Sequence, residues 1–182
     1  MGVGAVVAAG LVTAGQVALA DPAQPPPAAQ AARAEPLVAG TPCSNSAKSC
    51  VDLESQRAWL FQDGKVLRGP VPIASGGMGQ ETPVGHSLRV YRKEKDHVSS
   101  ESFTNGVPDG MPYSVFFEDG GIAFHAGDPD NSSGGCIHLD LEDAKAWFAY
   151  LQIGDKVQVV KHSAEMAARG LPVDPSKGES EG

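Results

Sequence analysis

The feature that most constrains the fold of this chain is an alternation of apolar and polar side chains that begins near Val51 and recurs to residue 160. Side chains on a strand point alternately to opposite faces, so this pattern predicts half-buried β-strands. Residues 58–62 and 65–67 flank the pair Asp63-Gly64, which is typical of a tight hairpin turn. The pattern predicts further strands at residues 51–54, 71–75, 86–91, 114–117, 122–125 and 157–160.

One segment has the spacing of an amphipathic helix instead. Asp140 is a favoured N-cap, Asp143 follows three residues later, and Gly154 marks the end. We therefore expect a mostly β fold, a β-sandwich of mixed short strands with one main helix after a loop at residues 126–135. The apolar stripe of the expected helix consists of Leu141, Ala144, Phe148 and Leu151.

The two ends of the chain differ in composition from this region. Residues 1–20 are small and apolar and end in Ala-Leu-Ala, which is typical of a signal peptide. An uncleaved membrane anchor is the alternative, because the run is nearly long enough to span a bilayer. Residues 21–42 are rich in proline and alanine and predict an extended linker. We expect one catalytic domain at residues 43–162 and a flexible tail at 163–182.

The charge of the chain argues against a nucleic-acid partner. The formal net charge is −8, and the one basic cluster within residues 51–161, at 89–95, is interrupted by Glu94. Nucleic-acid binding requires a basic face, so none is expected here. Contact with a membrane is expected only if residues 1–20 stay uncleaved.

The three cysteines suggest two different roles. Cys43 and Cys50 enclose six residues at the start of the expected domain, and a disulfide between them suits an exported protein. Free thiols or a bridge to another chain are the alternatives. Cys136 is then the odd cysteine and remains a thiol.

The segment that begins at His125 carries the residue types of thiol-based acyl transfer. Cys136 is a nucleophile only as a thiolate, and His125 can accept its proton. Gly134 and Gly135 allow a tight bend that points backbone N–H groups at a developing oxyanion. His138 is a rival base, since residues two apart on a strand share a face. A buried structural cysteine, and a zinc site built from the same thiol and imidazoles, are the competing interpretations. No metal is expected, because the short paired Cys or His spacings of zinc sites are absent from the sequence.

This segment resembles the catalytic domain of L,D-transpeptidases, bacterial cell-wall enzymes whose signature is an upstream His followed by Ser-His-Gly-Cys-Ile/Val-Arg. The run Ser-Gly-Gly-Cys-Ile-His at residues 133–138 matches the end of that signature. The resemblance covers roughly residues 51–161, and its segments occur in the expected order. They are Ile-Ala-Ser-Gly at 73–76, Glu-Thr-Pro-Val-Gly at 81–85, Met-Pro-Tyr at 111–113 with Phe116, and Gly-Asp-Lys-Val at 154–157.

Two positions depart from the family signature. Gly134 stands where the family has a histidine, and His138 stands where it has an arginine. The nucleophile and the upstream base are both retained, so the departures bear on substrate positioning and on rate.

The remaining site residues follow from the segment and from the resemblance together. The backbone N–H groups of Gly135 and Cys136 would form the oxyanion hole. The resemblance implies that the backbone carbonyl of Ala126 orients the base. The expected substrate-binding side chains are Tyr113, Ser133 and His138, with a purely structural role as the alternative for Tyr113 and Ser133.

The residues indicate the reaction class, and the resemblance supplies the substrate. We expect a secreted, extracytoplasmic L,D-transpeptidase of the cell wall that acts on donor and acceptor peptidoglycan stem peptides. It would form 3→3 cross-links through a thioester acyl-enzyme and would need no cofactor. An L,D-carboxypeptidase that uses the same site, and a non-catalytic cell-wall-binding module, are the alternatives.

Overall fold

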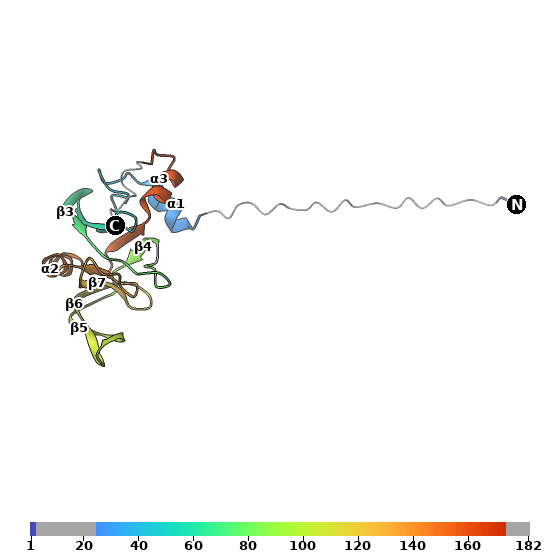
Figure 1. Cartoon of the computed structure of the whole chain (residues 1–182). Coiled ribbons are helices and arrows are strands. Elements are labelled where there is room, and N and C mark those ends of the chain that lie inside the picture. The colour runs from blue at the N-terminus through green and yellow to red at the C-terminus, as the bar shows by residue number, and fades with distance from the viewer. Residues whose placement is uncertain (3–24, 174–182) are drawn as a thin grey trace.

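The computed structural model describes residues 1–2 and 25–173, and it arranges their strands in two sheets (Figure 1). Apart from its first two residues, the expected signal peptide or anchor lies outside the described residues, as does the end of the expected tail. Among the residues described, no helix is long and apolar enough to cross a membrane.

The first sheet has five strands in the order β3-β2-β1-β9-β4. The two central strands, β1 and β9, run parallel, and the outer pairs are antiparallel. The expected hairpin forms at its edge, with the turn between β2 and β3. The strands are β1 (Ser49–Asp52), β2 (Arg57–Gln62), β3 (Lys65–Pro72), β4 (Gly85–Arg89) and β9 (Lys156–Val160).

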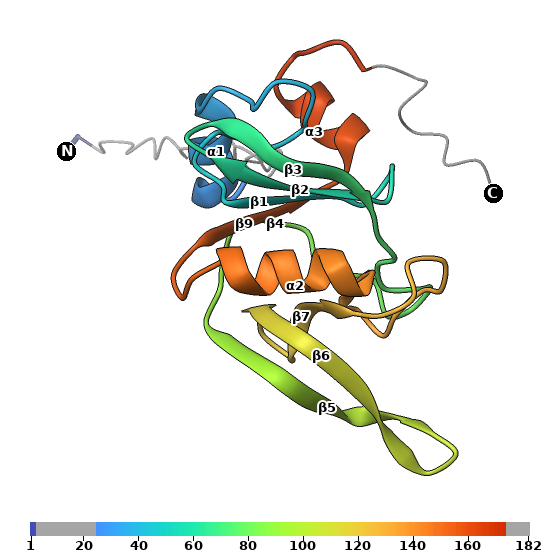
Figure 2. The same cartoon turned by 90° about the vertical axis from the view of Figure 1, so that its left-hand side faces the viewer.

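The second sheet has four strands in the order β5-β6-β7-β8, of which only β7 and β8 are parallel. A long hairpin of β5 and β6 extends away from the rest of the molecule (Figure 2). Most of β5 was not expected from the pattern, because its side chains are largely exposed and lack the alternation of a half-buried strand. The strands are β5 (Arg92–Thr104), β6 (Val107–Glu118), β7 (Ile122–Ala126) and β8 (Ile137–Leu139).

The helix α2 (Leu141–Tyr150) lies between the two sheets (Figure 2). Its N-cap is Asp140, whose carboxylate accepts a 2.9 Å hydrogen bond from the backbone N–H of Asp143, as expected. Trp147 is fully buried and donates from Nε1 to Ser49 Oγ of β1 at 3.0 Å. Leu141, expected in the apolar stripe, is 48% exposed, because the helix turns Ala144 and Trp147 toward the core instead. These contacts make a sandwich of two sheets with one main helix, as the sequence predicted.

The segments flanking the sheets are more ordered than expected. Residues 27–34, expected to be part of an extended linker, form the helix α1 (Pro27–Ala34), and residues 162–168 form α3 (His162–Ala168). Alanine is the best helix former and proline is accepted in a first turn, so the composition that suggested a linker also suits a short helix. Arg169 donates to the backbone carbonyls of Ala32, Arg33 and Glu35, which joins the two ends. The expected linker and tail are therefore incorrect over these helical segments.

The structure contains the Cys43–Cys50 disulfide, with the two sulfur atoms 2.06 Å apart. Both cysteines are fully buried and pack in a small apolar cluster with residues of β2 and β9. The bridge fixes the segment that enters the first sheet to β1. Cys136 is the one free cysteine among the described residues.

Candidate active site

The parallel pairing of β7 with β8 brings the predicted catalytic residues to one surface. Its register places His125 opposite His138 and Phe124 opposite Ile137. Paired residues share a face of a sheet, and Cys136 lies two positions before His138, on the same face. The thiol and both imidazoles line one groove of about 810 Å³. One wall of this groove comes from residues 77–80 and the other from the hairpin of β5 and β6.

His125 is held in the form that a general base requires. The residue is only 5% exposed, and Nδ1 lies 2.9 Å from the backbone carbonyl oxygen of Ala126. A carbonyl only accepts hydrogen bonds, so Nδ1 carries the proton and Nε2 keeps its lone pair. Burial, together with the smaller effect of the nearby His138, lowers the pKa of His125 to about 4, although the hydrogen bond to Ala126 acts in the opposite direction. The imidazole is therefore neutral at neutral pH.

Cys136 is protonated at rest. Burial raises the pKa of its thiol, and the negative charge of Glu101 on β5 acts in the same direction. Its Sγ donates to the backbone carbonyl of Gly121 at 3.7 Å, in the turn before β7. Because a neutral thiol and a neutral imidazole line the same groove, the proton has to leave the sulfur during the attack.

The side chain of His138 forms hydrogen bonds to the loop at residues 126–135. Its Nδ1 donates to the backbone carbonyls of Asn131, at 3.0 Å, and Asp128, at 3.2 Å. Its ring centroid lies 4.9 Å from that of His125, at a steep angle. A Cβ atom on Gly127 would come within 2.7 Å of the His138 ring, so glycine is required for this close approach. These contacts favour a structural role for His138 beside its place in the groove.

The expected oxyanion hole needs a correction. The N–H of Gly135 donates to Ser133 Oγ at 3.0 Å, which leaves it unavailable to a substrate. Gly135 has a φ of +122°, a conformation open to glycine, and this turns its amide inward. Within the residues that the structure describes, the N–H groups of Gly134 and Cys136 donate to no protein acceptor. The candidate oxyanion hole is therefore formed by these two amides instead of the expected pair, Gly135 and Cys136.

Ser133 acts within the loop. Its hydroxyl donates to the backbone carbonyl of Cys136 at 2.5 Å and accepts from Gly135. Its backbone N–H donates to Ser75 O and its carbonyl accepts from Gly77 N, each at 3.0 Å. Although Ser133 also lines the groove, these bonds indicate that it shapes the turn before the cysteine.

Tyr113 does not line the groove, contrary to expectation. Its ring packs edge-on against Phe148 of α2, with the ring centroids 5.7 Å apart. Its backbone has a φ of +59°, which turns the side chain toward the helix. Met111 and Phe116 of the same strand line the groove instead.

Several residues of the groove are not indicated by any pattern in the sequence. Arg92, His97 and Glu101 reach the groove from β5, and Gln80 reaches it from the loop before β4. They carry no motif, and only the fold of the long hairpin brings them to the cysteine. Across the described part of the chain, no group of three or more His, Cys, Asp or Glu side chains is arranged to hold a metal ion.

Comparison with known proteins places this geometry in a family. The L,D-transpeptidase catalytic domain (YkuD) matches residues 46–159. No curated protein sequence matches the chain.

Solved L,D-transpeptidases share the fold. One from Stackebrandtia nassauensis is 30% identical with a TM-score of 0.55, and the match covers 63% of this chain and 55% of that one. One from Mycobacterium tuberculosis H37Rv is 25% identical with a TM-score of 0.57, covering 65% and 59%. One from Enterococcus faecium is 28% identical with a TM-score of 0.54, covering 63% and 50%. The matched region spans between half and three fifths of these proteins. This chain belongs to the L,D-transpeptidase catalytic-domain family.

Proposed function

We propose that this protein is an exported, cysteine-dependent L,D-transpeptidase that forms 3→3 cross-links in peptidoglycan. The observation that carries the proposal is the pairing of β7 with β8, which lines one groove with a thiol and a neutral, oriented imidazole. Family membership supports the substrate class, a peptidoglycan stem peptide. The composition of residues 1–20 supports export.

The first half-reaction forms the acyl-enzyme. His125 Nε2 takes the proton from Cys136 Sγ as the sulfur attacks the carbonyl carbon of the third stem residue. The N–H groups of Gly134 and Cys136 stabilise the oxyanion of the tetrahedral intermediate. The carbon–nitrogen bond to the terminal D-amino acid then breaks, and the leaving amine takes the proton from the imidazolium. The product is a thioester on Cys136.

The second half-reaction consumes the thioester. An amine from a neighbouring stem peptide gives up a proton to His125 and attacks the thioester carbon. The carbon–sulfur bond breaks, the thiolate takes the proton back, and a new amide links two third residues. If water attacks instead, the same site acts as an L,D-carboxypeptidase. If no thioester forms, the protein is a non-catalytic cell-wall-binding module.

The test is covalent capture of the cysteine. One solved L,D-transpeptidase of this fold is in complex with imipenem, which makes imipenem a suitable probe. Incubation with imipenem should add one drug mass to the intact protein, and peptide mapping should locate it on Cys136. The adduct should be absent from Cys136→Ala and from His125→Ala, and it should form more slowly in His138→Ala. An unmodified wild-type protein would favour the binding module.

Product analysis separates the two enzymatic alternatives. With disaccharide-tetrapeptide as the only substrate, a transpeptidase yields a cross-linked dimer and free D-amino acid. A carboxypeptidase yields disaccharide-tripeptide without dimer. Dimer is the expected product.

A further inference from the structure

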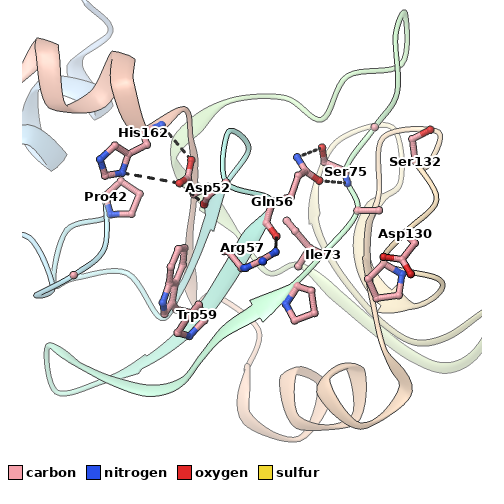
Figure 3. A pocket seen from close by; sticks show the side chains of 17 residues that line it. Pro42, Asp52, Gln56, Arg57, Trp59, Ile73, Ser75, Asp130, Ser132 and His162 are labelled. Atoms are coloured by element: carbon pink, nitrogen blue, oxygen red, sulfur yellow. Dashed lines mark hydrogen bonds and ion pairs between the residues drawn. The ribbon is translucent and has the colours of Figure 1, made fainter. Parts of the chain in front are cut away.

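A second cavity lies on the other side of the loop at residues 126–135. It has a volume of about 1200 Å³ and lies between that loop and the hairpin of β2 and β3 (Figure 3). Ser132 lines both this cavity and the catalytic groove. Gly76 lines the cavity and the adjacent Gly77 lines the groove, so the cavity and the groove adjoin at the loop. A ligand that occupies both the cavity and the groove would pass directly over this loop.

One side of this cavity is built from flat, rigid apolar groups. It contains an edge of the Trp59 indole, which is 7% exposed, and three prolines. Among the described residues, Trp59 Nε1 has no hydrogen-bond partner and no side-chain nitrogen or oxygen is both buried and unpartnered. Its N–H is therefore not sealed from solvent, in contrast to that of Trp147, which is bonded to Ser49. The prolines are Pro42, Pro70 and Pro72.

The polar groups of the cavity divide into satisfied and free ones. The carboxylate of Asp52 accepts from the backbone N–H groups of Glu54 and His162, and the Gln56 amide is bonded to Ser75. Arg57, by contrast, is exposed and donates only to a neighbouring backbone carbonyl within the described part of the chain. Only the side chains that are not already hydrogen-bonded within the protein are left to bind a ligand.

The groups available to a ligand combine donors with acceptors. The Arg57 guanidinium and the Trp59 N–H can donate, and the exposed Asp130 carboxylate can accept within what the structure describes. With Asp52, the cavity has two carboxylates and one guanidinium, which disfavours a phosphate or a polyanion and favours an uncharged ligand. Flat apolar surfaces beside planar hydrogen-bonding side chains suit a ring that has one apolar face and a rim of hydroxyl and amide groups. An N-acetylated sugar has this chemistry.

We propose that this cavity binds the glycan strand of the donor while its stem peptide occupies the catalytic groove. The proposal rests on the proposed function for the identity of the polymer. The sugar packs on Pro70, Pro72 and the edge of Trp59, and its acetamido oxygen accepts from Arg57 or Trp59. A sugar hydroxyl donates to Asp130. The loop at residues 126–135 then lies beneath the junction of sugar and peptide.

Direct binding tests the cavity without catalysis. The chain contains two tryptophans, and Trp147 is fully buried in the core. Titration with the tetramer of N-acetylglucosamine should therefore produce a saturable change in fluorescence that arises from Trp59. The change should be lost in Trp59→Phe and weakened about fivefold in apparent affinity in Arg57→Gln, which removes one charged hydrogen bond. An unchanged wild-type spectrum and an unaltered heteronuclear NMR spectrum on addition of the sugar would overturn the proposal.

Kinetics test the link to the reaction. The KM of Arg57→Gln for disaccharide-tetrapeptide should rise about fivefold, a larger rise than its KM for free tetrapeptide shows. Arg89→Gln is the matched control, because Arg89 is an exposed arginine on β4, at the opposite edge of the same sheet. Equal changes with both substrates would overturn the glycan assignment. Failure of imipenem to modify wild-type protein would count against the proposed function alone, since the fluorescence titration needs no catalysis.

Discussion

The resting states of His125 and Cys136 determine how the reaction depends on pH. A neutral imidazole is the active form of the base, and burial lowers the pKa of His125 to about 4. The base is therefore competent above about pH 4 and is lost as pH falls through that value. Burial also raises the pKa of the Cys136 thiol, so thiolate does not accumulate near neutrality. The rate of acylation by imipenem should be nearly constant from pH 5 to 8 and fall below about pH 4. A midpoint near 6.5, the value of an ordinary histidine, would contradict this assignment.

Glu101 affects the same thiol through its charge. This exposed residue of β5 lines the groove, and its carboxylate contributes to raising the pKa of Cys136. Glu101→Gln should lower that pKa and increase the rate of alkylation by iodoacetamide at pH 8 by about twofold, with a smaller gain at high salt. Glu142→Gln is the control, because Glu142 lies on the exposed face of α2 and bonds to Lys145. Equal rates in both variants would show that the hairpin lies farther from the cysteine.

At the scale of elements, the loop between β7 and β8 depends on the packing of one glycine against one ring. A methyl group at Gly127 would meet His138 Cγ at 2.7 Å and Cδ2 at 2.8 Å. Gly127→Ala should therefore displace the ring, release the carbonyls of Asp128 and Asn131, and slow acylation of Cys136 by about tenfold. In a His138→Ala background the same substitution should cost little, because the clashing ring is gone. Additive losses in the double variant would mean that Gly127 acts independently of His138.

The elements also show what the sequence could and could not predict. Strands such as β2 and β7 bury several consecutive residues, and the apolar pattern of these short runs, bounded by turn residues, identified them. The outer part of β5 has two solvated faces and no such pattern, so its approach to the cysteine was missed. The motif around Cys136 gave the nucleophile and the base, but the partner of each amide depends on side-chain geometry. The hydroxyl of Ser133 takes the Gly135 N–H, and no spacing in the sequence indicates that choice.

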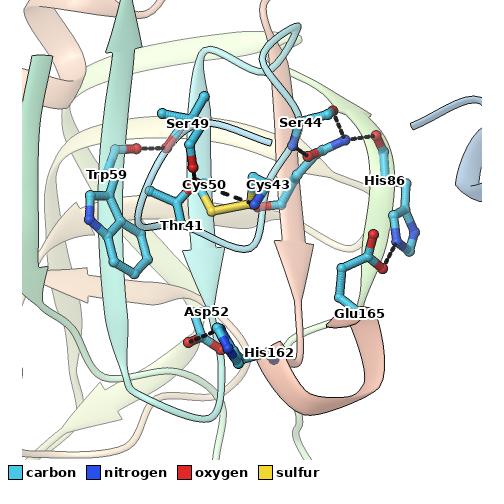
Figure 4. The surroundings of a disulfide bond; sticks show 12 residues. Thr41, Cys43, Ser44, Ser49, Cys50, Asp52, Trp59, His86, His162 and Glu165 are labelled. Atoms are coloured by element: carbon cyan, nitrogen blue, oxygen red, sulfur yellow. Dashed lines mark hydrogen bonds and ion pairs between the residues drawn. A yellow bond between two sulfur atoms is a disulfide. The ribbon is translucent and has the colours of Figure 1, made fainter. Parts of the chain in front are cut away.

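At the scale of the whole molecule, the two ends of the described domain are joined through one buried carboxylate. Glu165 of α3 is 2% exposed and accepts from His86 of β4 at 2.8 Å (Figure 4). It also accepts from Arg33 of α1 at 3.1 Å and from Arg169 at 2.9 Å. Glu165 thus connects segments far apart in the sequence that the composition alone assigned to a linker and a tail.

Replacing Glu165 should separate these segments and lower stability in a pH-dependent way. Burial raises the pKa of Glu165, but hydrogen bonds from His86 and Arg169 outweigh it and lower the pKa to about 2. Because the folded-state pKa is depressed, the stabilisation is fully present above the unfolded value near 4.5 and is lost as pH falls toward 2.

Glu165→Gln should reduce the free energy of unfolding at pH 7 by about 3 kcal/mol, since it leaves buried cations without their partner. Urea unfolding at pH 7 and at pH 3 should show a smaller difference from wild type at the lower pH. Glu142→Gln, which removes an exposed ion pair, should leave stability nearly unchanged at either pH. A loss for Glu165→Gln that stays the same at both pH values would mean that packing of α3, rather than the charge of Glu165, holds the ends together.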